Sequence, residues 1–155
     1  MIAVVQRVSN ANVSINKELF AEIKKGILLL LGVFVDDTEK DLIYSVNKVI
    51  NLRIFPNNRK NMELSIKEIG GEILLVSQFT LCGDIKKGRR PSFVNAANPS
   101  KGKKYYLKFI NMLKQEGITV KTGQFGSNMQ VELNNDGPVT VIIDSKQNSW
   151  SIILE

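Results

Sequence analysis

The stretch SQFTL, residues 77–81, places hydroxyl and amide groups directly after the apolar run ILLV. If it is the end of a buried strand, Ser77, Phe79 and Leu81 point to one side and Gln78 and Thr80 to the other. Hydroxyl and amide groups beside a cavity can bind an oxyanion or a ribose. The same residues also suit an ordinary strand end whose polar groups are hydrogen-bonded.

The chain contains no His and a single Cys, Cys82. A Ser-His-Asp or Cys-His catalytic group therefore cannot form within one chain. A zinc site of the usual His and Cys ligands and an intrachain disulfide are excluded too. A lone Cys of this kind is more often a small buried hydrophobe than a nucleophile. Ser77 and Thr80 are poor nucleophiles, because no His is available to take their protons.

A basic segment follows, GDIKKGRRP, residues 83–91. Its four charges are either a solvated run or a set of phosphate contacts, since Arg and Lys spaced by Gly can wrap a nucleic-acid backbone. Its position directly after SQFTL favours phosphate contact. The four candidate residues are Lys86, Lys87, Arg89 and Arg90.

Two later stretches have unusual local chemistry. In GQFGSNMQV, residues 123–131, Phe125 stands between two Gly and Met129 follows, which suits either a hairpin bend or a stacking platform for a nucleobase. In NNDGPVTVIID, residues 134–144, Gly137-Pro138 precedes a strand-like run, although Pro cannot donate to a sheet. This pair is either a turn or a backbone shape with a role of its own.

Arg7 is a charge within the otherwise apolar stretch IAVVQRV, residues 2–8. It either faces solvent or pairs inside a pocket.

The whole chain sets the frame for these residues. Its 155 residues predict a single domain, 1–155. A net charge of +6 permits a nucleic-acid partner without requiring one. We expect no signal peptide and no membrane span, because the longest apolar run, residues 26–35, is too short; a cytoplasmic location is predicted. Residues 145–155 carry no motif.

Hydrophobic patterns predict the elements that hold these motifs. Strands are expected at 2–8, 26–35 and 70–81, a hairpin around Asn16-Lys17, and further strands in ITVKTG, MQVEL, VTVIID and WSIIL. Helices are expected at 36–52 and 97–117. Seven or eight strands with mostly hairpin-length connections predict an α+β domain with a mostly antiparallel or mixed, barrel-like sheet and two helices.

Taken together, SQFTL, GDIKKGRRPSF, GQFGSNM and NNDGPVT resemble the D-aminoacyl-tRNA deacylase family, also called D-tyrosyl-tRNA deacylases. The resemblance runs from residue 1 to about 144. It implies a homodimer that hydrolyses the ester between a D-amino acid, or glycine, and the 3′-terminal adenosine of tRNA, without a metal or other cofactor. The tRNA is therefore the expected partner.

The resemblance also assigns roles to residues. Ser77, Gln78, Phe79 and Thr80 would form the catalytic motif, with main-chain N–H groups near Phe79 and Thr80 as the oxyanion site and the tRNA 2′-hydroxyl in place of a protein base. Phe125 and Met129 would hold the adenosine. The chirality-sensing motif would comprise Gly137, Pro138, Val139 and Thr140, with a cis Gly-Pro bond that reaches into the other subunit and Arg7 nearby.

Several alternatives stay open. Thr80 could be the nucleophile if a Lys or an N-terminal amine activated it. A sister deacylase that removes L-alanine has the Gly-Pro bond in trans, so the state of that bond separates the two. The chain could also bind tRNA without catalysis, or bind no RNA at all. Arg89, Gly102 and Ser127 depart from the family's usual residues, and Ser127 is close to the expected adenine pocket.

Overall fold

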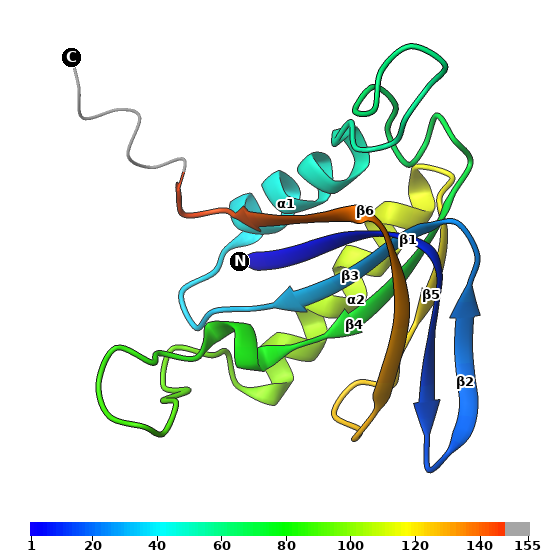
Figure 1. Ribbon diagram of the computed structural model, residues 1–155. Coiled ribbons are helices and arrows are strands. Elements are labelled where there is room, and N and C mark those ends of the chain that lie inside the picture. Colours follow the sequence, from blue (N-terminus) through cyan, green and yellow to red (C-terminus); the bar gives the residue numbers. More distant parts are fainter. Residues whose placement is uncertain (148–155) are drawn as a thin grey trace, which may run out of the picture.

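Six strands and two α-helices make up residues 1–147, the part of the chain that the computed structural model describes (Figure 1). The elements are β1 (Ile2–Ile15), β2 (Glu18–Ile23), β3 (Gly26–Gly32), α1 (Glu39–Asn51), β4 (Glu72–Ser77), the 3₁₀ helix η1 (Phe79–Cys82), α2 (Pro99–Gln115), β5 (Thr119–Thr122) and β6 (Gln130–Asp144). The strands form one mixed sheet that curls toward a barrel, which confirms the predicted α+β class.

The long strand β1 organises the sheet. Along one edge it pairs antiparallel with β6, from Ile2↔Asp144 to Ser14↔Gln130. Along the other edge its first half pairs with β3 and its second half with β2. The predicted hairpin between β1 and β2 is confirmed, and Asn16 and Lys17 have φ angles of 52° and 66° at its turn.

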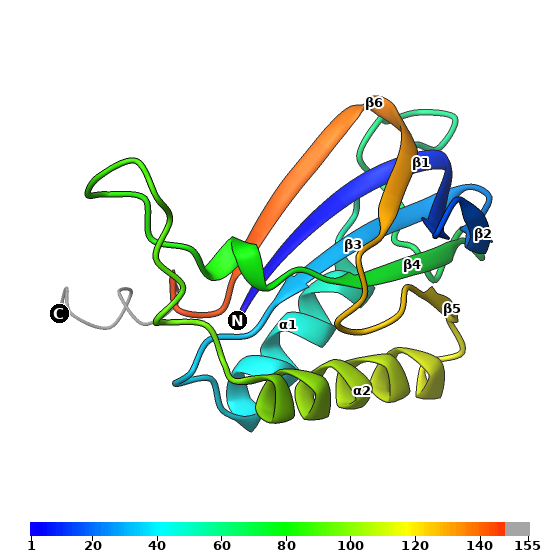
Figure 2. The ribbon, with the colours of Figure 1, turned by 90° about the horizontal axis from the view of Figure 1, so that it is seen from below.

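Parallel pairing joins β3, β4 and β5, in a sheet that was predicted to be mostly antiparallel or mixed. β3 pairs parallel with β4, and β4 with β5. Parallel neighbours need a long crossover, and α1 and α2 lie in these two connections. Figure 2 shows both helices against the same face of the sheet.

The central strands are buried on both faces, which explains their continuous apolar sequences. Ile27, Leu29 and Leu31 of β3 belong to the core cluster that also contains the inner faces of α1 and α2. Leu28 belongs to a second cluster, with residues of β1, β2 and β4. The sheet is therefore sandwiched between the two helices and its own curled edge.

Several predicted boundaries were wrong. The run expected as a strand over 70–81 leaves the sheet at Ser77 and turns into η1. MQVEL and VTVIID form one continuous strand, β6, which lowers the number of strands in residues 1–147 to six. The strand expected at 150–154 lies outside the described residues. None of the helices in residues 1–147 is long and apolar enough to cross a membrane.

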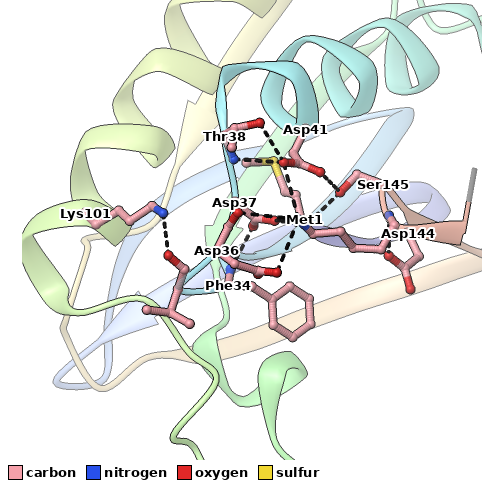
Figure 3. A network of polar contacts seen from close by, with 11 residues as sticks. Met1, Phe34, Asp36, Asp37, Thr38, Asp41, Lys101, Asp144 and Ser145 are labelled. Carbon is pink, nitrogen blue, oxygen red and sulfur yellow. Dashed lines mark hydrogen bonds and ion pairs between the residues drawn. The ribbon is translucent and has the colours of Figure 1, made fainter. Parts of the chain in front are cut away.

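A buried polar network ties the end of β6 to the starts of β1 and α1 (Figure 3). The Met1 ammonium donates to Asp37 Oδ1 at 2.5 Å and to Ser145 Oγ at 2.6 Å. Ser145 Oγ in turn donates to Asp41 Oδ1 at 2.7 Å. Burial alone would raise the pKa of Asp41, but hydrogen bonds from Ser145 and Thr38 and the nearby ammonium lower it to about 2.

Candidate active site at the end of β4

An open pocket of about 600 Å³ lies beside the carboxyl end of β4. One wall is the β4 end and the start of η1, and the opposite wall is the loop after β5. The loop before α2 and the first turn of that helix close a third side. The residues that carry the argument below are Ser77, Gln78, Phe79, Phe125 and Met129.

The first wall forms because the chain leaves the sheet after Ser77. Ser77 is the last β4 residue paired with β3, opposite Leu31, and Gln78 N–H still donates to the Leu31 carbonyl at 2.8 Å. The chain then turns into η1, so the predicted strand alternation of residues 77–81 does not occur. Ser77, Gln78 and Phe79 line the pocket. Thr80 lies just outside it, and its hydroxyl accepts a hydrogen bond from the Gln78 amide.

Two main-chain donors are free at the start of η1. Within the described residues, no acceptor bonds the N–H of Phe79 or Thr80, as is usual for the first N–H groups of a helical turn. Phe79 is 57% exposed, and its ring meets the Phe93 ring edge-on at a centroid distance of 5.1 Å. The pocket mouth therefore combines two aromatic edges with unsatisfied donors.

The second wall carries Phe125 and Met129, which the structure brings to the same pocket as Ser77 and Gln78. Phe125 packs on the buried Tyr106 ring at 5.6 Å between centroids. Gly102, one turn before Tyr106 on α2, also meets this ring, and a Cβ atom there would be 3.5 Å from Phe125 Cζ. An aromatic face and a thioether thus make this wall suited to a flat, apolar group.

The basic loop lies beside the pocket and not in it. Lys86, Lys87, Arg89 and Arg90 are all exposed, and none forms an ion pair within residues 1–147. A bridge between Asp84 and Ser92 closes the base of the loop, at 2.8 and 2.9 Å. Four exposed charges are therefore held next to the mouth.

The Gly137-Pro138 element lies elsewhere on the chain. Its peptide bond is cis, and both residues are exposed and do not line the pocket. It lies beside Arg7 of β1. The pocket end of β4 is at another level of the sheet, because Ser77 pairs with Leu31 of β3, and Leu31 pairs with Ala3 of β1. Four residues of β1, about 13 Å of strand, separate these two levels. One chain therefore does not bring its two main motifs together.

Arg7 is buried against this element instead of facing solvent. Its Nε donates to the Asp136 carbonyl and its Nη1 to the Ile54 carbonyl, each at 2.7 Å. The Asp136 carboxylate is 3.9 Å from Nε, so the main-chain contacts are the shorter ones.

Sequence reasoning missed Asn135, which clamps the same element from inside the strand. Its Oδ1 accepts from Val139 N–H at 2.7 Å, and its Nδ2 donates to the Thr140 hydroxyl at 3.0 Å. These bonds span Gly137-Pro138, where the β1–β6 register shifts. An Asn two residues before a Gly-Pro pair, with its capacity to bond nearby backbone, was the available signal. Pocket residues before α2, such as Phe93 and Asn98, were also missed.

Cys82 is buried at the end of η1. Burial, with a contribution from the Asp37 charge, raises its pKa to about 11. A thiol with such a pKa is almost wholly protonated at neutral pH, so it is unsuited to nucleophilic attack.

The fold, with its mixed sheet and two helices on one face, is also found in solved structures. A solved structure described as a probable eukaryotic D-amino acid tRNA deacylase superposes with a TM-score of 0.80 at 18% identity, covering 92% of this chain and 97% of that one. The chain belongs to the D-Tyr-tRNA(Tyr) deacylase family, whose model matches residues 4–144. Members of this family are hydrolases that act on aminoacyl-tRNA.

Two bacterial relatives are named as D-aminoacyl-tRNA deacylases. The D-aminoacyl-tRNA deacylase of Thermosipho melanesiensis is 54% identical over 148 residues, which are 95% of this chain and 99% of the relative. That of Clostridioides difficile is 51% identical over 148 residues, 96% of this chain and 99% of the relative. A solved structure named c-Myc DNA Unwinding Element Binding Protein is 39% identical with a TM-score of 0.88, covering 93% of this chain and 98% of that one.

Proposed function

We propose that this chain hydrolyses the ester that links a D-amino acid, or glycine, to the 3′-terminal adenosine of tRNA. The observation that carries the proposal is the shared pocket: Phe125 and Met129 face Ser77, Gln78 and Phe79 across one cavity. An aromatic and thioether wall suits a nucleobase, and a wall of amide and hydroxyl groups suits a ribose and an ester.

The free N–H groups of Phe79 and Thr80 are the proposed oxyanion site. They lie at the point where the chain turns away from the pocket, and their direction is fixed by η1. One such donor changes a hydrolysis rate by roughly 10²–10³ when it is removed.

The tRNA 2′-hydroxyl is the proposed proton acceptor, in place of a protein base. The sequence holds no His, and no Lys lines the pocket within residues 1–147. The Thr80 hydroxyl is bonded to the neutral Gln78 amide, which cannot take its proton. This arrangement supports a positioning role for Thr80 over that of nucleophile.

A second copy of the chain is proposed to supply the chirality test. Gly137-Pro138 is exposed and lies away from the pocket of its own chain, while Arg7 and Asn135 hold it in a fixed shape. A rigid exposed element is well suited to enter the pocket of a partner. There it would leave no room for an L side chain and would admit glycine.

Hydrolysis of D-tyrosyl-tRNA, L-tyrosyl-tRNA and L-alanyl-tRNA, measured side by side with EDTA present, tests the proposal. Release from the D substrate only is the expected result. Release from L-alanyl-tRNA, without release from D-tyrosyl-tRNA, would instead indicate the sister activity. Binding of tRNA with no release from any substrate would contradict an enzymatic role.

A further inference from the structure

Tyr106 of α2 lies behind the point where the two pocket walls separate. β4 and β5 pair from Glu72↔Thr119 to Leu75↔Thr122. Beyond this point β4 continues to Ser77, while the segment that follows β5 turns away toward Phe125. The last bond across the gap runs from Gly123 N–H to the Leu75 carbonyl, at 3.2 Å. The width of the pocket is therefore set at this fork.

The Tyr106 hydroxyl touches both sides of the fork. It lies 3.3 Å from the Leu75 carbonyl oxygen and 3.3 Å from the Gly123 carbonyl oxygen, and the residue is only 4% exposed. Burial raises the pKa of Tyr106, against a smaller lowering by a hydrogen bond with the Thr122 side chain, so the hydroxyl stays protonated and remains a donor. The Leu75 carbonyl would keep its bond from Gly123 N–H, but the buried Gly123 carbonyl accepts from no other donor within residues 1–147 and would be left unpaired without the Tyr106 hydroxyl.

The Tyr106 ring supports the same wall from behind. It packs on Phe125 at a tilt of 46°, and Gly123, which its hydroxyl bonds, is so close to Met129 that a Cβ atom there would be 2.6 Å from Sδ. One side chain thus fixes the backbone at Gly123 and the ring of Phe125. Neither contact reaches the main-chain donors of Phe79 and Thr80.

We infer that Tyr106 is a positioning residue for the pocket wall of Phe125 and Met129, where the adenosine is proposed to bind. Tyr106 would thereby affect substrate binding without taking part in the chemical step. The identity of the substrate in this inference rests on the proposed function, whereas the contacts of Tyr106 are independent of it. Loss of the hydroxyl should loosen the wall of Phe125 and Met129, while the wall of Ser77, Gln78 and Phe79 keeps its shape.

Tyr106→Phe, which removes only the hydroxyl, is the test, with Tyr105→Phe as the matched control. Tyr105 is the preceding residue, is 8% exposed and does not line the pocket. We expect Tyr106→Phe to raise KM for D-tyrosyl-tRNA about five- to tenfold with kcat unchanged, the size expected for one lost hydrogen bond. The control should behave as wild type. An unchanged KM, or a fall in kcat at constant KM, would overturn the inference.

A second measurement is independent of hydrolysis. Adenosine 5′-monophosphate is titrated into protein carrying ¹³C-methyl methionine, and the Met129 resonance is followed. Tyr106→Phe should weaken the apparent affinity by the same factor, and an affinity equal to wild type would overturn the inference. If the wild type hydrolyses no D-aminoacyl-tRNA, the proposed function fails, yet this titration still decides the role of Tyr106.

If Tyr106→Phe does not fold, ¹³Cζ-tyrosine labelling of the wild type takes its place. The Tyr106 resonance should shift when the nucleotide binds. A Tyr106 resonance that stays constant through saturation would overturn the inference.

Discussion

Arg7 holds the main chain of Asp136, the residue before Gly137, by a 2.7 Å hydrogen bond from its Nε. Its Nη1 holds Ile54 in the same way, so one buried guanidinium joins β1, β6 and the segment after α1. Two fixed directions of donation are a property of Arg that the single ammonium of Lys cannot reproduce.

Arg7→Lys should therefore misplace the Gly-Pro element. We expect kcat/KM for D-tyrosyl-tRNA to fall about 10- to 100-fold, the equivalent of one lost hydrogen bond from a charged group. Arg53→Lys is the control, because Arg53 Nε also donates to a carbonyl, that of Glu63, but its side chain is 59% exposed. Equal losses in both variants would show that the Arg7 contacts have no special role.

Gly137→Ala should disable the same element by crowding. Gly137 has φ 146°, and a Cβ atom there would lie 2.7 Å from Val139 Cγ2 and 3.1 Å from Arg7 Nη2. We expect loss of D-specific hydrolysis. Gly117→Ala, at φ 79° with no atom near the added Cβ, is the control for backbone strain alone. It should lower stability by about 1 kcal/mol and leave hydrolysis intact. Retained D-specificity in Gly137→Ala would contradict this account.

The basic loop should act through charge. Replacing Lys86, Lys87, Arg89 and Arg90 by Ala should weaken tRNA binding across tRNA sequences and reduce the slope of log K against log salt by up to about three. Binding isotherms at several salt concentrations measure the slope. The double variant Lys86/Lys87→Ala is compared with a control, Lys24/Lys25→Ala. Lys24 and Lys25 are exposed and precede β3, at the end of that strand away from the pocket. Equal slopes in those two variants would count against a phosphate role for the loop.

Asp41 should make the fold sensitive to acid. Its pKa is lowered from 3.8 to about 2, so its contribution is complete above pH 3.8 and is lost as the pH falls toward 2. The contribution is about 2 kcal/mol. Urea unfolding at several pH values should show a shallower decline in Asp41→Asn than in wild type over this range. Asp36→Asn, an exposed carboxyl, is the control. A wild-type decline in Asp41→Asn would place the acid sensitivity elsewhere.

The sequence predicts those parts of the fold that local chemistry decides. The α1 stripe of Leu42, Val46 and Val49 is buried as its helical spacing requires. Asn16 and Lys17 both have positive φ, as the two-residue turn between the predicted strands requires. Phe125 and Met129 line the same pocket as Ser77, Gln78 and Phe79, whereas their role as an adenosine site stays a prediction.

Tertiary context decides the rest. Nothing in FTLC distinguishes the 3₁₀ turn of η1 from a continued strand. A Pro such as Pro138 normally ends a strand, but among residues 1–147 β6 pairs only with β1, so the missing N–H falls where no ladder bond is needed. The partners of Arg7 come from Ile54 and Asp136, far along the chain, and no local pattern marks them.

The pairing of β1 with β6 also has a consequence for synthesis on the ribosome. Ile2 cannot meet Asp144 until the intervening residues have been made, which takes roughly 7 to 28 s at the usual elongation rates. During that interval one whole edge of β1 lacks its partner, and unpaired strand edges invite association with other chains. The nascent chain is therefore most exposed to aggregation and to chaperones just before β6 emerges.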